Sequence, residues 1–177
     1  MMKKSLSIAV ALTVAWAGAA SAHGPSRQKL TETIEINAAP AAVWEVVKEF
    51  GKPEAWMPAV ASTTSQGGTA PGATRELTLK KGGVLKEELK TYEAEKMSFS
   101  YKMENPDCGI LPVNNYSSNI SVEAAGSGSK VTWNGAYYRC FLANNPPPDQ
   151  NEEAANKAIE AVYKESLANL KAVIEKK

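Results

Sequence analysis

The two cysteines, Cys108 and Cys140, are the first residues in this chain whose type could support chemistry. A pair of thiols can form a disulfide, bind a metal or supply a nucleophile, and the last two roles need partners such as histidine. The single histidine, His23, is distant from both in the sequence, and no second group of metal ligands accompanies them. The sequence therefore favours a disulfide, and we assign neither a metal site nor a cofactor.

Acid–base chemistry would depend on carboxylates and phenols. A Ser-His or Cys-His nucleophile needs an internal base, which His23 does not supply because it precedes the first predicted strand. Residues 86–90 are rich in Glu and Lys, as is typical of a solvated strand face. The groups that could transfer protons or donate hydrogen bonds to a ligand are Glu76, Glu87, Glu88, Tyr101, Tyr116 and Tyr137. No catalytic constellation results, so we assign no catalytic residue and expect a protein that is not an enzyme.

The first residues have the pattern of a signal peptide. Lys3 and Lys4 precede an apolar run over 6–20, and Ala20-Ser21-Ala22 has the small-x-small pattern of a cleavage site. The run is shorter than the roughly 20 residues of a membrane span, although a retained anchor is the alternative. We expect cleavage after Ala22, a periplasmic location and a single domain over 23–177.

Cleavage there would make His23 the first residue, where its amine and imidazole could bind Cu(II). Pro25 lacks a backbone N–H and no second histidine is present, so we assign no copper site. The loss of two lysines would change the net charge from +1 to −1, which gives no indication of nucleic-acid or membrane binding. In an oxidising compartment the Cys108–Cys140 pair is expected to be bridged, which would stabilise the fold by about 3.5–4 kcal/mol.

Hydrophobic periodicity predicts the elements that would position these residues. Apolar residues recur at three- and four-residue steps over 152–177, which predicts a long C-terminal helix capped by Asp149. Two short helices are expected from Pro40 and within 53–58. Alternating patterns predict strands at 30–36, 60–65, 74–79, 84–93, 96–103, 116–123 and 130–141.

This order of elements predicts an α+β fold. Strands joined by short turns form a seven-stranded antiparallel meander, and a long amphipathic helix can cover its apolar face. Two short helices follow the first strand. The direction of the strands places Cys108 and Cys140 at the same end of the sheet.

Several motifs in this order resemble one known family. They are Val43-Trp44-Glu45-Val46-Val47, Phe50-Gly51-Lys52-Pro53-Glu54-Ala55-Trp56-Met57-Pro58, Leu111-Pro112-Val113-Asn114-Asn115-Tyr116 and Val131-Thr132-Trp133. The sequence resembles the SRPBCC (Bet v 1/START-like) superfamily in its polyketide cyclase/dehydrase branch. That resemblance implies a helix-grip fold, in which a curved sheet and the final helix enclose a cavity.

Three further features narrow the resemblance. The signal peptide, the cysteine pair and the insert over 144–148 are similar to the periplasmic MxaD-type proteins of methanol oxidation. This likeness implies a non-enzymatic accessory protein that assists electron transfer between methanol dehydrogenase and cytochrome cL. Those two proteins are the partners it implies.

The helix-grip resemblance also implies a ligand cavity. The candidates for its wall are Trp44, Trp56, Met57, Arg75, Leu79, Phe99, Tyr101, Met103, Tyr116, Trp133, Tyr137, Ile159, Val162, Ser166 and Leu170, with Arg75 and Arg139 as polar determinants. The alternative is that most of them are ordinary core, because large aromatic residues dominate cores in any case.

The loops at the cysteine end are candidates for docking a partner. The residues concerned are Ile110, Leu111, Val113, Phe141, Leu142, Pro146 and Pro147. Bracing by a disulfide would lower the cost of ordering such a surface on binding. The alternative is that Leu111 and Phe141 turn inward and close the cavity.

Two other functions stay open at this point. The protein could carry or sense a small apolar or aromatic ligand, and the quinone cofactor of methanol dehydrogenase would need more cationic lining than Arg75 and Arg139 clearly provide. It could also be a cyclase-like enzyme, by analogy with other members of the superfamily, which is a weak warrant because one fold supports many functions.

Overall fold

The computed structural model describes residues 24–176, so the predicted signal peptide and His23 lie outside the described residues. In chain order the elements are β1 (Gln28–Ile36), α1 (Pro40–Val47), the 3-10 helix η1 (Pro53–Ala55), β2 (Val60–Gln66), β3 (Thr74–Leu79), β4 (Val84–Glu93), the 3-10 helix η2 (Ala94–Lys96), β5 (Ser98–Met103), β6 (Val113–Ala125), β7 (Gly128–Arg139) and α2 (Glu152–Glu175).

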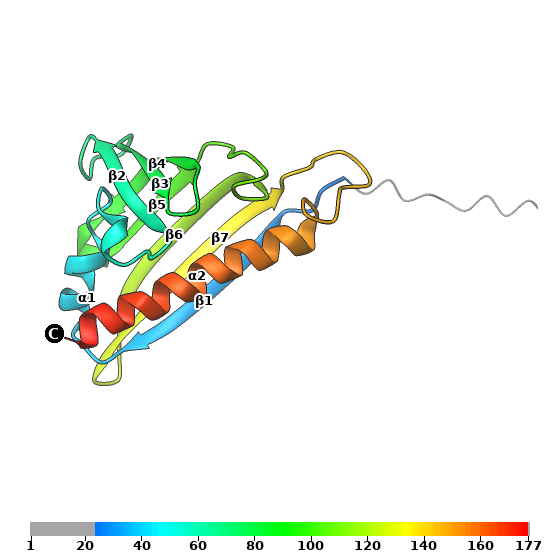
Figure 1. Cartoon of the computed structure of the whole chain (residues 1–177). Helices are drawn as coiled ribbons and strands as arrows, with labels where there is room; N and C mark the ends of the chain where they lie inside the picture. Colours follow the sequence, from blue (N-terminus) through cyan, green and yellow to red (C-terminus); the bar gives the residue numbers. More distant parts are fainter. Residues whose placement is uncertain (1–23, 177) are drawn as a thin grey trace, which may run out of the picture.

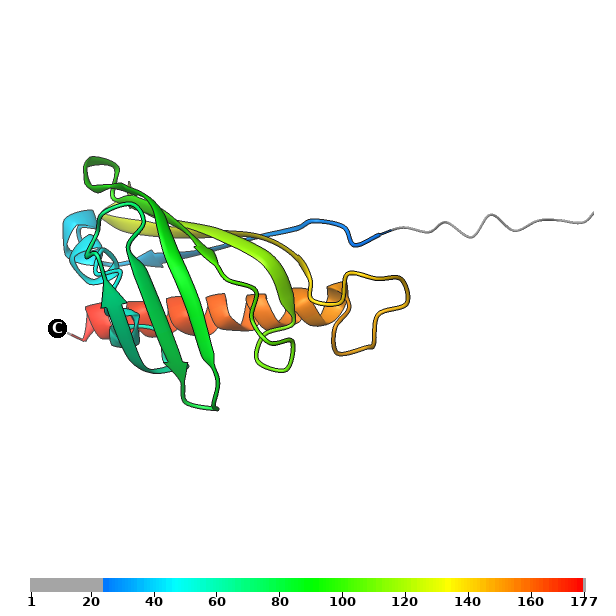
Figure 2. The same cartoon turned by 90° about the horizontal axis from the view of Figure 1, so that it is seen from above.

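The seven strands form one antiparallel sheet in the order β1-β7-β6-β5-β4-β3-β2. The sheet is a meander from β2 to β7, and β1 closes it by pairing with β7. Helix α2 lies along β1 and β7, while β2, β3 and β4 lie at a steep angle to it (Figures 1 and 2). The predicted seven-stranded curved sheet with two short helices and a long C-terminal helix is therefore confirmed.

The core lies between the concave face of the sheet and one face of α2. That helix face carries Ala155, Ile159, Tyr163, Leu167 and Leu170, which recur at helical spacing and are all buried. Helix α1 closes the sheet at the end where α2 finishes (Figure 1). The predicted helix stripe is thus the inner layer of the molecule.

The bounds of β1, β2 and β7 differ from the predicted ranges by one or two residues, and three further local details also differ from the sequence-based expectation. The cap of α2 is Asn151, whose side chain accepts a hydrogen bond from the Ala154 amide at 2.8 Å, so the prediction of Asp149 was wrong. Met97 has a φ of 47°, so it belongs to a turn and β5 begins after it. Asn115 also has a φ of 47° and lies in a bulge of β6, which allows that strand to begin at Val113 rather than at Tyr116.

The predicted disulfide between Cys108 and Cys140 is present. Its Cα atoms are 5.8 Å apart, and it joins residues separated by 32 positions. It fastens the loop after β5 to the end of β7, at the end of the molecule opposite α1 (Figure 1). A disulfide of this kind is typical of proteins in oxidising compartments. Within residues 24–176 no helix is long and apolar enough to cross a membrane.

Candidate ligand-binding site

A cavity of about 750 Å³ lies between the sheet and α2. Its walls are mainly apolar and come from β3, β4, β5, the loop after β5, and α2. Exposed residues Lys80, Lys81 and Glu165 also line it, so the cavity reaches solvent between the β3–β4 turn and the helix. Its opposite end is lined by Glu87, Tyr101, Tyr116, Trp133 and Tyr163, all of which are buried.

The rim of the mouth is formed where two loops touch. Gly83, in the β3–β4 turn, has a φ of +92°, and a Cβ there would lie 2.6 Å from Cδ1 of Ile110. The loop held by Cys108 therefore packs Ile110 directly on the turn, and only glycine leaves room for this contact. The disulfide positions one side of the cavity mouth.

A buried ion pair lies at the inner end. Arg75 on β3 and Glu87 on β4 are cross-strand partners, and Arg75 Nε donates to Glu87 Oε2 at 2.6 Å. Arg75 Nη1 also donates to the Phe50 carbonyl at 2.7 Å, and the guanidinium lies 4.1 Å from the Phe50 ring centroid and 5.0 Å from that of Tyr101. The arginine is therefore held within the wall, and the carboxylate is the charged group that lines the inner cavity.

Four side chains beside this pair form a connected group of hydroxyls and an indole. Tyr116 Oη lies 2.6 Å from Tyr163 Oη, which lies 3.2 Å from Ser118 Oγ. Trp133 Nε1 donates to Ser118 Oγ at 2.7 Å. Strands β6 and β7 and helix α2 together bring these atoms to one place.

The position of Tyr163 depends on a glycine. A Cβ at Gly135 would lie 2.3 Å from the Tyr163 hydroxyl, so β7 must leave this side open for the phenol. The Tyr163 ring also stacks on Trp133, with centroids 4.0 Å apart and an interplanar angle of 11°. Backbone and indole thus fix the hydroxyl over the sheet.

Burial changes the acidity of these groups. It raises the pKa of the Glu87 carboxyl, and the charge and hydrogen bond of Arg75 oppose that rise. Burial, and after it the Glu87 charge, raises the pKa of Tyr101 to about 12. Burial also raises the pKa values of Tyr116 and Tyr163 well above that of an ordinary phenol. The phenols are therefore neutral hydrogen-bonding groups near neutral pH.

About half of the residues predicted to line a cavity do line this one. They are Met57, Leu79, Tyr101, Met103, Tyr116, Trp133, Ile159 and Val162. The others lie outside its wall, namely Trp44, Trp56, Arg75, Phe99, Tyr137, Ser166 and Leu170. Trp44 and Phe99 pack together, with ring centroids 6.2 Å apart, and Trp56 packs edge-on against Trp133. Ser166 and Leu170 are buried nearer the C-terminal end of α2.

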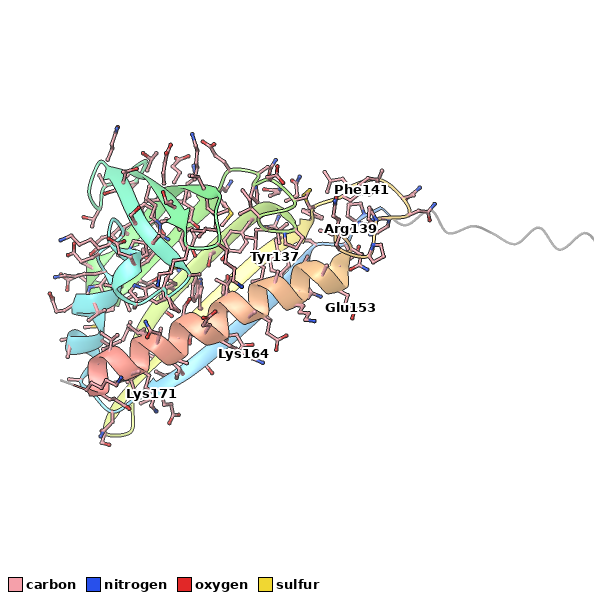
Figure 3. All side chains as sticks on the ribbon, viewed as in Figure 1. Tyr137, Arg139, Phe141, Glu153, Lys164 and Lys171 are labelled. Atoms are coloured by element: carbon pink, nitrogen blue, oxygen red, sulfur yellow. A yellow bond between two sulfur atoms is a disulfide. The ribbon has the colours of Figure 1, made fainter. Side chains whose placement is uncertain are left out.

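The two arginines expected as polar determinants do not face the cavity. Arg75 is engaged by Glu87 and Phe50, as described above. Arg139 donates to the carbonyls of Phe141 at 2.7 Å and Ala143 at 3.0 Å and pairs with Glu152, so it joins the end of β7 to the start of α2. Figure 3 shows Tyr137, Arg139 and Phe141 following one another toward this end of the molecule. The guanidinium groups of Arg75 and Arg139 therefore stabilise the fold and are not placed to bind a ligand in the cavity.

The predicted docking residues divide into two sets. Leu111 lines the cavity and Val113 is fully buried in β6, so these two are not available at the surface, whereas Ile110 is half-buried at the cavity mouth. Phe141 and Pro146 are half-buried, whereas Leu142 and Pro147 are exposed. Leu111 therefore turns inward and helps to close the cavity, as the alternative interpretation had it. Leu142 lies at the surface, where it could contact a partner.

Glu87 and Tyr163, two buried polar residues of the cavity wall, were not among the predicted lining residues. Glu87 was assigned to a solvated face, although it alternates with Leu85 and Leu89, and that two-residue period places it inward. Tyr163 follows Ile159 by four positions on the helix stripe, and this spacing places it on the buried face. The described residues contain no group of three His, Cys, Asp or Glu side chains that could hold a metal.

The sequence matches the family described as "Polyketide cyclase / dehydrase and lipid transport" over residues 27–175. The chain belongs to this family. The broader resemblance noted in the sequence is thereby confirmed, and the narrower MxaD-type likeness stays a prediction. No curated protein matches the chain.

Solved structures with the same fold agree with membership of the polyketide cyclase/dehydrase family. The protein XoxI from Bacillus cereus is 25% identical with a TM-score of 0.70, over 82% of this chain and 94% of its own. A protein from Nitrosospira multiformis is 22% identical with a TM-score of 0.66, over 82% of this chain and 94% of its own. Ara h 8.0201 is 16% identical with a TM-score of 0.61, over 86% of this chain and 100% of its own. The last two show likeness of fold alone.

Proposed function

We propose that this protein is a non-enzymatic binding protein that holds one small, mainly apolar molecule between the sheet and α2. The observation that carries the proposal is the cavity of about 750 Å³, with apolar walls and a compact group of buried polar atoms at one end. Small-molecule sites are typically pockets of about 300–1,000 Å³ with few polar groups that fix orientation. A tightly packed interior would leave no space of this size.

The phenols among these polar groups favour binding over turnover. A general acid or base works best when its pKa lies near the operating pH. Burial raises the pKa of Tyr101 to about 12 and those of Tyr116 and Tyr163 well above the ordinary value, so the phenols are poor proton-transfer groups near neutral pH. They are suited to orienting a ligand by hydrogen bonds.

Titration with the neutral apolar fluorophore N-phenyl-1-naphthylamine tests this function. We expect a saturable rise in fluorescence with one site per chain. Val162→Trp places a large side chain in the cavity wall and should weaken binding at least tenfold. Ala168→Trp, at an exposed position of the same helix, is the matched control and should leave the affinity unchanged. Equal binding by the two variants, or no binding by the natural protein, would contradict the proposal.

We propose that the mature protein works in the periplasm. The predicted signal peptide and the Cys108–Cys140 disulfide support this location. Periplasmic extraction of cells that express the full chain, followed by mass measurement of the intact protein, tests both points. We expect a chain that begins at His23 and carries no free thiol, and a cytoplasmic chain with an uncut leader would contradict the location.

A second candidate function is the accessory role in methanol oxidation that the MxaD-type resemblance implies. The exposed Leu142, 47% accessible on a loop fastened by the neighbouring disulfide, favours it because a braced apolar surface can dock a partner at low ordering cost. The partners would be methanol dehydrogenase and cytochrome cL. The protein would assist electron transfer between them.

Binding and kinetic assays at low salt separate the two functions. The accessory role predicts a complex with one of these proteins and a changed rate of methanol-dependent cytochrome reduction. Leu142→Ser should weaken the complex and Val162→Trp should not, since the loop and the cavity are separate surfaces. Absence of both the complex and the rate change would exclude this second role and leave the binding function standing.

A further inference from the structure

Taking the proposed binding function as its basis, we propose that the cavity selects neutral ligands that donate a hydrogen bond, such as phenols and alcohols, over ethers of the same shape and over carboxylates. The selection comes from the direction in which the hydroxyl protons of the inner wall must point. That direction follows from which atoms can donate and which can only accept.

Ser118 sets the direction. The Asn134 carbonyl can only accept, so the Ser118 hydroxyl donates its single proton to it across 2.7 Å. The Trp133 indole N–H can only donate, so it donates to Ser118 Oγ across 2.7 Å. Ser118 therefore has no proton left for Tyr163 and can only accept from that phenol.

The direction then passes along the tyrosines. Tyr163 donates its proton to Ser118, so it must be the acceptor in the 2.6 Å hydrogen bond with Tyr116. Tyr116 is consequently the donor in that bond and has no second proton to give. Tyr116, Tyr163 and Ser118 therefore each donate their proton to the next group in a chain that ends at the Asn134 carbonyl, and the Tyr116 oxygen is left with its lone pairs.

The next phenol does not satisfy those lone pairs well. Tyr101 Oη lies 3.5 Å from Tyr116 Oη, which is longer than the 2.5–3.0 Å of a well-formed O–H···O bond. Both phenols line the cavity. The inner wall therefore presents a Tyr116 oxygen that can accept from a ligand and a Tyr101 hydroxyl that is free to turn toward one.

Glu87 adds a second acceptor. Arg75 Nε binds Oε2 of Glu87 at 2.6 Å, which leaves Oε1 as the oxygen that could accept from a ligand. Glu87 lines the same cavity and is only 5% accessible. A donor on the ligand would form a charge-assisted hydrogen bond with this oxygen, which is stronger than one between neutral groups.

Charge excludes anionic ligands. Arg75 is engaged by Glu87 and by the Phe50 carbonyl, and Arg139 lies outside the cavity. Lys80 and Lys81 are exposed at the mouth, so the inner cavity offers a carboxylate ligand no cation. A cationic ligand would add an unbalanced charge beside a pair that is already neutral, and both charges would pay a desolvation cost. A neutral hydroxyl fits best because it donates to Glu87 or Tyr116 and accepts from Tyr101.

Three probes with one apolar body test the selection on the natural protein by calorimetric titration. They are 4-propylphenol, which donates and accepts, 4-propylanisole, which only accepts, and 4-propylbenzoate, which is anionic. Apolar area alone would make the anisole bind more tightly, because it buries an extra methyl group. We expect the reverse order, with the phenol bound at least tenfold more tightly than the anisole and the benzoate weakest.

A pair of variants assigns the acceptor. Tyr116→Phe removes the accepting oxygen and should reduce the preference for the phenol over the anisole severalfold. Tyr137→Phe is the matched control, because the Tyr137 hydroxyl donates to Asn156 at 3.0 Å and lies outside the cavity wall. That variant should keep the natural preference. If Tyr116→Phe does not fold, the three probes on the natural protein still decide the selection.

The outcomes distinguish this inference from the function on which it rests. If the anisole or the benzoate binds as tightly as the phenol, the cavity is a binding site but the donor selection is overturned. An unchanged preference in Tyr116→Phe would overturn the assignment to Tyr116. If none of the probes binds while the fluorophore does, the selection is likewise overturned, and if neither binds, the proposed function fails with it.

Discussion

Two buried charges show how a single pair of residues shapes the interior. Arg75 and Glu87 are 3% and 5% accessible, and each is the main neighbour that balances the other. Removing one partner of a buried pair leaves an uncompensated charge, which costs more than replacing both by apolar residues. The pair is therefore coupled in its effect on stability, and Arg75 opposes the rise that burial causes in the pKa of the Glu87 carboxyl.

Arg75→Met should destabilise the protein by about 3–5 kcal/mol, because it leaves the Glu87 carboxylate buried alone. The double variant Arg75→Met/Glu87→Met should lose less than Arg75→Met, since no charge is then buried. Urea denaturation of the natural protein, both single variants and the double variant measures the coupling. Additive losses in the double variant would show that the two charges are independent.

The phenol of Tyr101 predicts a loss of stability in alkali. Burial, and then the Glu87 charge, raises its pKa from 10.0 to about 12, so between these values the unfolded chain releases a proton that the folded chain keeps. The free energy of unfolding should be unaffected by this group below pH 10.0 and should fall as the pH rises toward about 12. Tyr101→Phe should make the fall shallower. The same slope in the natural protein and the variant would contradict a raised pKa at Tyr101.

At the scale of elements, the contact between β7 and α2 depends on Gly135. The missing side chain at this position leaves space for the Tyr163 hydroxyl, which in turn meets Ser118 at 3.2 Å and Tyr116 at 2.6 Å. Strand and helix are thus matched by one small residue facing one large residue. This match places the polar group of the cavity where three elements converge.

Gly135→Ala should displace Tyr163, because the added Cβ would lie 2.3 Å from its hydroxyl oxygen. We expect a loss of about 1–3 kcal/mol, as is typical of overpacking. Tyr163→Phe removes the atom that clashes, so the double variant should be more stable than Gly135→Ala alone. Thermal unfolding of the natural protein, the two single variants and the double variant measures these stabilities. A double variant less stable than either single variant would contradict the contact.

The elements themselves could be predicted because their patterns are strong. The alternation of residues in the strands and the helical period of α2 require little knowledge of tertiary structure. The starts of β5 and β6 could not be placed, because Met97 and Asn115 adopt left-handed conformations. Such a conformation is rare for Met, and Asn adopts it in only some of its positions, so residue type does not locate it. The cap at Asn151 was missed because a competing acidic residue, Asp149, stands two positions earlier in the sequence.

The site was harder to predict than the fold. Its helix and strand lining followed from period and alternation at Ile159, Val162 and Tyr101. Arg75 was wrongly predicted to line the cavity. A buried charged residue suggests a ligand contact as long as its partner across the β3–β4 hairpin is unknown. The register of that hairpin, which pairs Arg75 with Glu87, carries the missing information. The cavity depends on how closely the sheet and α2 pack, which the sequence does not show. The sequence alone therefore indicates only which residues could form its walls.

For the whole molecule, the structure separates a stable interior from an exposed loop end. Leu170 is fully buried on α2, whereas Leu142 is 47% accessible on the loop after β7. Arg139 and the disulfide hold this loop to the body of the protein. Stability and partner docking should therefore respond to different residues.

Leu170→Ala should cost about 2–5 kcal/mol of unfolding free energy, as large-to-small changes in cores do. Leu142→Ser should change it by less than about 0.5 kcal/mol, because it alters an exposed position. Chemical denaturation compares the two variants directly. Similar losses from both changes would mean that the loop end belongs to the core.

The cavity between the sheet and α2 is the central claim, and NMR chemical-shift mapping with 4-propylphenol tests it most directly. We predict saturable shifts of the amides around the cavity, in particular those of Gly82, Ile110, Tyr116 and Ile159, with little change over residues 141–149. No saturable shifts, or shifts confined to residues 141–149, would contradict an interior binding site.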